Sequence, residues 1–179
     1  MIFTNIMNKN SKAGFTLIEI LIVVAIIAIL ASVVLVGLGP TQSLGRDARR
    51  VSDLHEVQNG LELYYNRCGF YPGSASAGAC GTAGAVASWS ALSAALTGAG
   101  VGISSVPNDP SGGTTSYVYG VNSGATPPNT TYILEATLEN GSGGSWNGYT
   151  TPTIPANMTW TSTAAPSCAQ TNNSYCITL

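Results

Sequence analysis

The sequence contains four cysteines, whose spacing indicates whether they form disulfides or bind a metal. Cys68 and Cys80 are close in the chain, as are Cys168 and Cys176. Four cysteines allow three pairings, and two local disulfides are the simplest of them. Zinc is the alternative, but neither pair has the short spacing of a structural zinc site, and His55 is the only histidine. The spacing favours two disulfides, which an extracytoplasmic location would permit.

Residue types for catalysis do not form a recognisable set. No serine, histidine and aspartate constellation, no paired carboxylates and no metal-ligand cluster are apparent in the sequence. A phosphate-binding Gly-rich loop followed by Lys and Ser or Thr is also absent. Asp109, next to Pro110, is expected to be a turn residue rather than a metal ligand. We therefore predict no enzyme, no metal and no cofactor.

Glu19 is an acid near the start of a long apolar run from Leu17 to Leu38. With about 1.5 Å of helical rise per residue, this run can cross most of a hydrocarbon core about 30 Å thick. A carboxylate without a partner would cost several kcal/mol in lipid. Glu19 therefore needs a partner, unless it only reaches out to the lipid headgroups of an ordinary anchor.

The segment KAGFTLIE at residues 12–19, followed directly by the apolar run, is specific enough to carry a resemblance. It combines a basic leader, a glycine before a phenylalanine, and a glutamate four residues after that phenylalanine. In these features it resembles the class III signal and first helix of type IV prepilins and type II secretion pseudopilins. An ordinary secretory signal differs, because its apolar stretch precedes the cleavage site and is discarded.

The resemblance implies a processing event at the start of the helix. A prepilin peptidase would cut between Gly14 and Phe15 and N-methylate the new Phe15 amine, leaving the apolar helix in place. Glu19 would then pair with the Phe15 amine of a neighbouring subunit, or of its own chain, during assembly. Such a pair compensates a buried charge and sets an axial register between subunits.

Four segments are expected along the chain. They are a leader at 1–14, a transmembrane and assembly helix at 15–39, an amphipathic helix at 40–67 that continues into the head, and an extracytoplasmic head at 68–179 with a variable C-terminal region. Lys9 and Lys12 place the leader on the cytoplasmic side. Gly39 and Pro40 predict a kink or a loosened turn within one long helix rather than its end.

The second half of the helix has an apolar stripe for the head and a charged face, which we expect toward solvent or neighbouring subunits. The charged residues are Arg46, Asp47, Arg49, Arg50, Asp53, Glu56 and Glu62. The spacing of Arg46 and Arg49 from Asp53 and Glu56 permits ion pairs along the helix face. These are either solvated pairs or, alternatively, contacts between subunits in a filament.

The head is predicted to be α+β, with a small antiparallel sheet packed on the long helix. Gly69 and Pro72 are expected to end that helix. Residues 89–96 are predicted to form a short helix, whose apolar positions are Trp89, Leu92, Ala95 and Leu96. Residues 116–121 and 132–138 alternate in the manner of strands and are expected to pair. The tail from residue 140 forms extra strands or an exposed loop. Tyr64, Tyr65 and Tyr71 are expected to pack under the head, and carbohydrate binding is the alternative. The exit from the helix and the order of the strands also resemble the pilin head.

Some major pseudopilins, as the resemblance implies, hold calcium in a loop after this region. Here the corresponding residues 122–131 contain no acid, so the calcium site is not expected. No basic residue follows Arg67, and the chain's formal net charge is −2. This neutral head argues against binding nucleic acid or an anionic membrane surface.

The resemblance implies a structural subunit of a type IV pilus or pilus-like filament. Its partners would be itself and other pilins, the prepilin peptidase and N-methyltransferase, an assembly platform protein, a cytoplasmic assembly ATPase and the membrane. The chain would span the inner membrane once, with its head outside the cytoplasm, and would enter a surface or periplasmic filament. A type II secretion pseudopilin is the alternative, and an anchored glycan-binding module is a more distant one.

Overall fold

The structure is a computed structural model of the chain. It describes residues 14–73, 80–81, 88–112, 117–140, 151–161, 165–168 and 173–179, with the backbone alone for residues 36–40. The expected leader up to residue 13 and residues 141–150 of the tail lie outside the described residues. The chain divides into two compact units, Met1–Pro40 and Thr41–Leu179, and each is described by itself.

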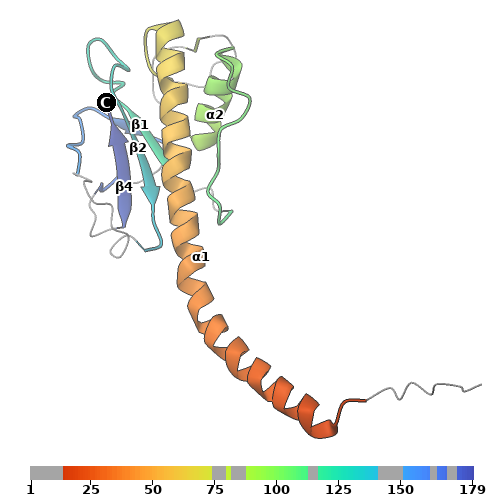
Figure 1. Ribbon diagram of the computed structural model, residues 1–179. Coiled ribbons are helices and arrows are strands. Elements are labelled where there is room, and N and C mark those ends of the chain that lie inside the picture. The colour runs from red at the N-terminus through yellow and green to blue at the C-terminus, as the bar shows by residue number, and fades with distance from the viewer. Residues whose placement is uncertain are drawn as a thin grey trace, which may run out of the picture. The chain divides into compact units, whose positions relative to one another are not determined.

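A single long helix, α1, runs from Leu17 to Cys68 (Figure 1). The helical backbone continues through Gly39 and Pro40, so the helix does not end there, as predicted. Gly69 follows the last helical residue with φ of 77°, and its N–H donates to the Tyr65 carbonyl at 2.8 Å. Glycine adopts this left-handed conformation without strain, which explains why the helix ends here.

The predicted short helix is α2, Trp89–Gly98. Ser88 caps it, because its hydroxyl accepts a hydrogen bond from Ala91 N–H at 3.1 Å. The four apolar positions named from the sequence are its buried residues, namely Trp89, Leu92, Ala95 and Leu96. The Trp89 indole N–H donates to the Pro107 carbonyl at 3.1 Å, so the polar atom of this large side chain is satisfied.

A four-stranded antiparallel sheet completes the head. Its strands are β1 (Tyr117–Val121), β2 (Tyr132–Thr137), β3 (Thr159–Trp160) and β4 (Ser174–Thr178). Their order across the sheet is β3-β1-β2-β4. The predicted antiparallel pairing of the first two strands is confirmed, with Tyr119 opposite Leu134. The tail supplies both outer strands, whereas the sequence pattern allowed either strands or a loop there.

The core lies between α1, α2 and one face of the sheet. In Figure 1 the head half of α1 has β1, β2 and β4 on one side and α2 on the other. Alternate strand residues point to this core, as period-two geometry requires. The core residues include Leu54, Val57, Leu61 and Tyr64 of α1, Leu92 and Leu96 of α2, and Tyr117, Tyr119, Tyr132 and Leu134 of the sheet. This confirms the predicted α+β head on the long helix.

The other face of the sheet is covered by the tail. Ile133, Cys168 and Cys176 form a second buried cluster there, joined by half-buried Ile154, Met158 and Trp160. The Trp160 ring lies against Gly120, where its atoms would be 2.1 Å from any added Cβ. A glycine in this strand therefore makes room for the indole, and the tail packs closely on β1.

Candidate assembly site

The N-terminal segment begins with an exposed, non-helical stretch. Gly14, Phe15 and Thr16 precede α1, and the Phe15 side chain is 84% exposed. Thr16 and Glu19 form a reciprocal cap. The Glu19 Oε2 accepts from Thr16 N–H at 2.8 Å and from the Thr16 hydroxyl at 2.7 Å, while Glu19 N–H donates to the Thr16 Oγ1 at 3.3 Å. Within one chain, the carboxylate is thus held at the start of the helix, next to Phe15.

The helical turns after Glu19 present an apolar surface on all sides. Leu17–Leu35 is long and apolar enough to cross a membrane, with a mean hydropathy of 3.1, and none of it is buried within the chain. The hydroxyl of Ser32 donates to the Ile29 carbonyl at 2.7 Å, so this polar group is satisfied inside its own helix. An apolar surface this large needs either lipid or other apolar helices against it.

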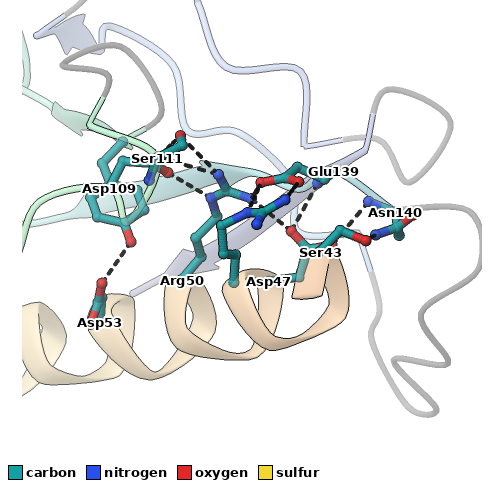
Figure 2. A network of polar contacts seen from close by, with 10 residues as sticks. Ser43, Asp47, Arg50, Asp53, Asp109, Ser111, Glu139 and Asn140 are labelled. Atoms are coloured by element: carbon teal, nitrogen blue, oxygen red, sulfur yellow. Dashed lines mark hydrogen bonds and ion pairs between the residues drawn. The ribbon is translucent and has the colours of Figure 1, made fainter. Parts of the chain in front are cut away.

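The head half of α1 carries a buried charge cluster centred on Arg50 (Figure 2). The Arg50 Nε donates to Asp109 Oδ2 at 2.6 Å, and its Nη1 lies 2.8 Å from Asp47 Oδ1 and 3.0 Å from Glu139 Oε1. The Nη2 reaches the Ser111 hydroxyl at 3.2 Å. Only 3% of Arg50 is exposed, so one guanidinium ties the helix to the turn after α2 and to the residues after β2.

Two further contacts strengthen this junction. Asp47 accepts the backbone N–H groups of Glu139 at 2.8 Å and of Asn140 at 2.9 Å. Arg46 pairs with the Glu139 carboxylate through two nitrogens, with Nε at 2.7 Å from Oε1. Charge-assisted and bidentate bonds of this kind fix geometry strongly. The chain that leaves β2 is therefore fastened to α1 at its backbone as well as its side chains.

The arginines keep these carboxyl groups charged. The hydrogen bonds from Arg46, followed by those from Arg50, lower the pKa of Glu139 to about 2. Burial alone would raise the pKa of Asp109, but hydrogen bonds from Arg50 and Ser111 outweigh it and hold that pKa well below its usual range. Glu139 and Asp109 are therefore ionised at neutral pH and paired with these arginines.

The predicted charged face is partly wrong. Asp47, Arg50 and Asp53 are buried rather than turned to solvent, because each has a partner in the head that compensates its desolvation. Arg46 pairs with Glu139 rather than with another helix residue. The one predicted pair along the helix that forms is Arg49 with Asp53, whose atoms are 3.9 Å apart.

The tyrosines serve the core, as expected. Tyr64 and Tyr71 are almost fully buried, and Tyr65 packs against the core from a half-buried position. The hydroxyl groups of Tyr64 and Tyr71 have polar partners inside the head. Tyr71 and Tyr132 both donate to the Glu62 carboxylate, at 3.2 and 3.1 Å to Oε1. The buried rings of Tyr64 and Tyr71 cannot form the exposed platform that a carbohydrate site requires.

The loop between β1 and β2 is organised by asparagine. The Asn122 Oδ1 accepts the N–H groups of Thr130 at 2.8 Å and of Thr131 at 2.9 Å. An uncharged amide thus folds a loop that contains no acid. Within the described part of the chain, no group of three or more His, Cys, Asp or Glu residues could hold a metal ion.

The cysteines form the two local pairs. Cys68 is bonded to Cys80, and Cys168 to Cys176. The first disulfide joins the last residue of α1 to the segment after the helix. The second joins residue 168 to β4, beneath the tail on the outer face of the sheet. The first disulfide therefore closes a loop that follows α1, and the second closes a loop that leads into β4.

The helical pattern does not reveal the Arg50 cluster, although the sequence holds a signal for it. Asp109 and Glu139 lie beyond Arg67, the last basic residue of the chain. A buried carboxylate needs a cation or several donors. Any cation for these two acids has to come from the helix arginines, and this reasoning leads from the distribution of charge alone to a contact between helix and head.

Comparison with known proteins gives one family model, which matches the N-terminal segment, and one relative that is similar over part of its length. Residues 9–35 match the family model described as the prokaryotic N-terminal methylation motif. The type II secretion system core protein G of Aeromonas hydrophila is 36% identical over 58 residues, which is 32% of this chain and 41% of that protein. The match thus covers less than half the length of this curated relative. No solved structure matches the chain.

Proposed function

We propose that this chain, which belongs to the type IV pilin and pseudopilin family, is a structural subunit of a type IV pilus or pilus-like filament. Members of this family are structural subunits rather than enzymes, in agreement with the prediction from sequence. The observation that carries the proposal is the helical surface Leu17–Leu35, none of which the chain itself buries. The head has a complete core of its own, so the apolar surface is left for lipid and for other subunits.

The first step is processing by a prepilin peptidase between Gly14 and Phe15, with N-methylation of the new Phe15 amine. The matched methylation motif supports this step. The geometry also suits it, because Gly14 is exposed and non-helical, just before the cap at Thr16. A peptidase needs an extended backbone that it can reach, and here the helix begins only after the cleavage point.

Glu19 then directs assembly by pairing with the Phe15 amine of a neighbouring subunit or of its own chain. The hydrogen bonds from Thr16 hold the carboxylate at the helix start, near where that amine would lie. In lipid the pair compensates a carboxylate that would otherwise be costly. Because the amine and the acid occupy fixed positions in each copy, the pair sets the axial register of neighbours.

Assembly exchanges one apolar environment for another. A protomer stored in the inner membrane, with its head outside the cytoplasm, moves into a bundle in which neighbouring helices replace lipid around Leu17–Leu35. Contact between apolar helices differs little from contact with lipid, so packing and polar pairs must supply the direction. A cytoplasmic assembly ATPase acting through a platform protein would supply the energy.

A pseudopilin of a type II secretion system is the second candidate. The similarity to core protein G favours it. The longer tail with the Cys168–Cys176 disulfide favours the pilus, while the acid-free loop at 122–131 weakens the case for a major pseudopilin. Deleting the gene separates the two: loss of surface filaments with secretion intact indicates a pilus, and retained periplasmic secretion substrates indicate a pseudopilus.

The proposal is tested by mass spectrometry of the N-terminal peptide from sheared filaments and from membranes. Wild type is compared with Glu19→Ala and with Ser32→Ala, a matched control inside the same helix. We expect a methylated Phe15 terminus in the wild-type and Ser32→Ala filaments, and the same terminus confined to membranes in Glu19→Ala. An intact Met1 terminus, found only in membranes in all three strains, would overturn the proposal and leave an ordinary anchored domain.

A further inference from the structure

Glu56 stands apart from the other carboxylates of the head. Within the described part of the chain, Asp47, Asp53, Glu62, Asp109, Glu135 and Glu139 each take part in at least one hydrogen bond. Glu56 is exposed on α1, and its side chain makes no hydrogen bond or ion pair among the described residues. It therefore presents an uncompensated negative charge on the surface of the helix.

Arg49 is its counterpart among the cations. The guanidinium groups of Arg46 and Arg50 are bound to Glu139 and Asp109, and that of Arg67 donates to the Gly100 carbonyl at 3.0 Å. The Arg49 side chain is 65% exposed, and its Nε is 3.9 Å from Asp53. Asp53 accepts the Tyr117 hydroxyl at 2.7 Å, so its carboxylate is already engaged.

The spacing of these two charges prevents a closed pair within one chain but suits neighbouring copies. Seven residues are about two helical turns, which place both side chains on the same face about 10 Å apart along the axis. In parallel copies offset axially by that distance, Arg49 of one lies level with Glu56 of the next. The contact is heterologous, since each copy uses a different residue toward each neighbour, and such contacts propagate into open helical filaments.

A groove beside Glu56 offers room for the incoming side chain. It has a volume of about 260 Å³ and lies between α1 and the segment after α2; its lining includes Glu56, Val57, Gly60, Leu63, Ile103 and Ser104. Gly60 lets that segment approach the helix, because Ile103 Cδ1 lies 2.8 Å from the position of any added Cβ. An arginine can lay its apolar stem on such a floor while its charged head meets a carboxylate at the rim.

We propose that Arg49 of one copy of this chain enters the groove of the next copy and pairs with Glu56, joining the heads of adjacent subunits. The inference rests on the proposed filament function and adds a contact in the head to the assembly helix. The charge complementarity and the adjoining groove carry it together. An exposed ion pair is weak alone, but here it recurs at every subunit step.

Charge reversal in the full-length chain tests the contact. We expect Arg49→Glu and Glu56→Arg, each expressed alone, to reduce sheared filaments several-fold while the protein remains processed in the membrane. Expressed together, the two variants should restore filaments, because each supplies the charge that the other needs. Asn66→Glu, an exposed control on the same helix, should leave the yield unchanged. Full yield from both single variants, or no recovery on co-expression, would overturn the proposal.

Cysteine cross-linking tests the geometry independently. A chain carrying both Arg49→Cys and Glu56→Cys cannot close a disulfide within itself, because the Cβ atoms must approach to about 4 Å. Mild oxidation of its filaments should give a ladder of multimers, as each copy bonds to the next. A chain carrying Arg67→Cys and Glu56→Cys is the matched control and should stay monomeric. Dimers alone would indicate a two-fold contact, and a ladder only in the control would indicate Arg67 as the partner; both overturn the proposal.

The proposed contact and the proposed function are contradicted by different experimental results. Absence of wild-type filaments with an intact Met1 terminus contradicts the proposed function itself. Wild-type filaments that show the methylated Phe15 terminus, but neither respond to charge reversal nor cross-link, leave that function standing and exclude only the Arg49–Glu56 contact.

Discussion

At the scale of single residues, Arg50 is the side chain on which the junction of helix and head depends. It binds Asp47 on its own helix, Asp109 in the turn after α2 and Glu139 after β2. A buried charge network of this kind is weak support for stability as a whole, because desolvation offsets much of the attraction. Its role is specificity, since the bonds define where two irregular segments meet the helix.

Replacing Arg50 with methionine should therefore be severe. The substitution keeps an unbranched side chain but leaves buried carboxylates without their cation, which costs about 3–5 kcal/mol of unfolding free energy. Denaturant unfolding of the detergent-solubilised protein, followed by circular dichroism, measures the loss. Arg49→Met is the control, since its exposed side chain should cost no more than about 1 kcal/mol. Equal losses in the two variants would contradict the central position of Arg50.

The same cluster makes the head sensitive to acid. The pKa of Glu139 falls from an ordinary 4.5 to about 2 on folding, and the pKa of Asp109 is also lowered. A carboxyl group with a lowered folded-state pKa adds stability above its unfolded pKa and loses it as the pH falls toward the folded value. We expect the melting temperature to fall as the pH drops from about 4.5 to about 2 through this contribution.

Arg50→Met separates this effect from general acid denaturation. Without the Arg50 guanidinium the pKa of Asp109 rises, whereas Arg46 still lowers the pKa of Glu139. The variant should therefore start from a lower melting temperature at neutral pH and lose less as the medium is acidified. Melting curves recorded across the acid range by circular dichroism provide the comparison. Parallel curves for the wild type and the variant would show that the acid sensitivity arises elsewhere.

At the scale of elements, β4 depends on a covalent link as well as on pairing. It is an outer strand of the sheet, hydrogen-bonded to β2, and Cys176 within it is bonded to Cys168. The tail segment that packs on the outer face is thereby anchored to the strand. Tyr175 and Ile177 on the opposite side pack toward the main core. The strand thus connects the two clusters of the head.

Removing this disulfide should loosen β4 selectively. The double substitution Cys168→Ser with Cys176→Ser should cost about 2–3 kcal/mol, as expected for a short closed loop. Amide hydrogen exchange should accelerate first in residues 174–178, while the head half of α1 stays protected. Cys68→Ser with Cys80→Ser is the paired control, whose fastest change should appear at the end of α1. Uniform acceleration in both variants would contradict two separate roles.

The sequence predicts the elements better than the contacts between them. The periodicity of apolar residues is local information, because it can be recognised within a few turns or a pair of strands. It predicts the helix α1, the buried face of α2 and the pairing of β1 with β2. The helical pattern places Arg50 toward solvent, because it shows that the residue is charged but not that a residue far along the chain pairs with it. Asp109 lies 59 residues away from it. The methylation motif is recognisable because its signal is a short, contiguous string.

At the scale of the whole molecule, the cores of the head and the exposed apolar helix lie in different parts of the chain. The main core, the outer cluster, the Arg50 network and both disulfides all lie within Thr41–Leu179. The apolar surface Leu17–Leu35 lies within Met1–Pro40 and contributes nothing to those cores. The proposed filament function requires this separation, because the head would fold before the helix leaves the membrane.

A fragment comprising residues 41–179 should therefore fold without a membrane. Its helix would begin one turn before Arg46, so the pair with Glu139 is retained. We expect a monomer in detergent-free buffer, with near-ultraviolet circular dichroism matching that of the full chain and a similar melting temperature. The full chain should need detergent or lipid, since its exposed apolar helix has no cover of its own.

Light scattering after size exclusion gives the oligomeric state of both the fragment and the full chain. Aggregation of the fragment, or loss of its aromatic signal, would show that the first forty residues take part in folding the head, and the division between a folding unit and an assembly unit would be wrong.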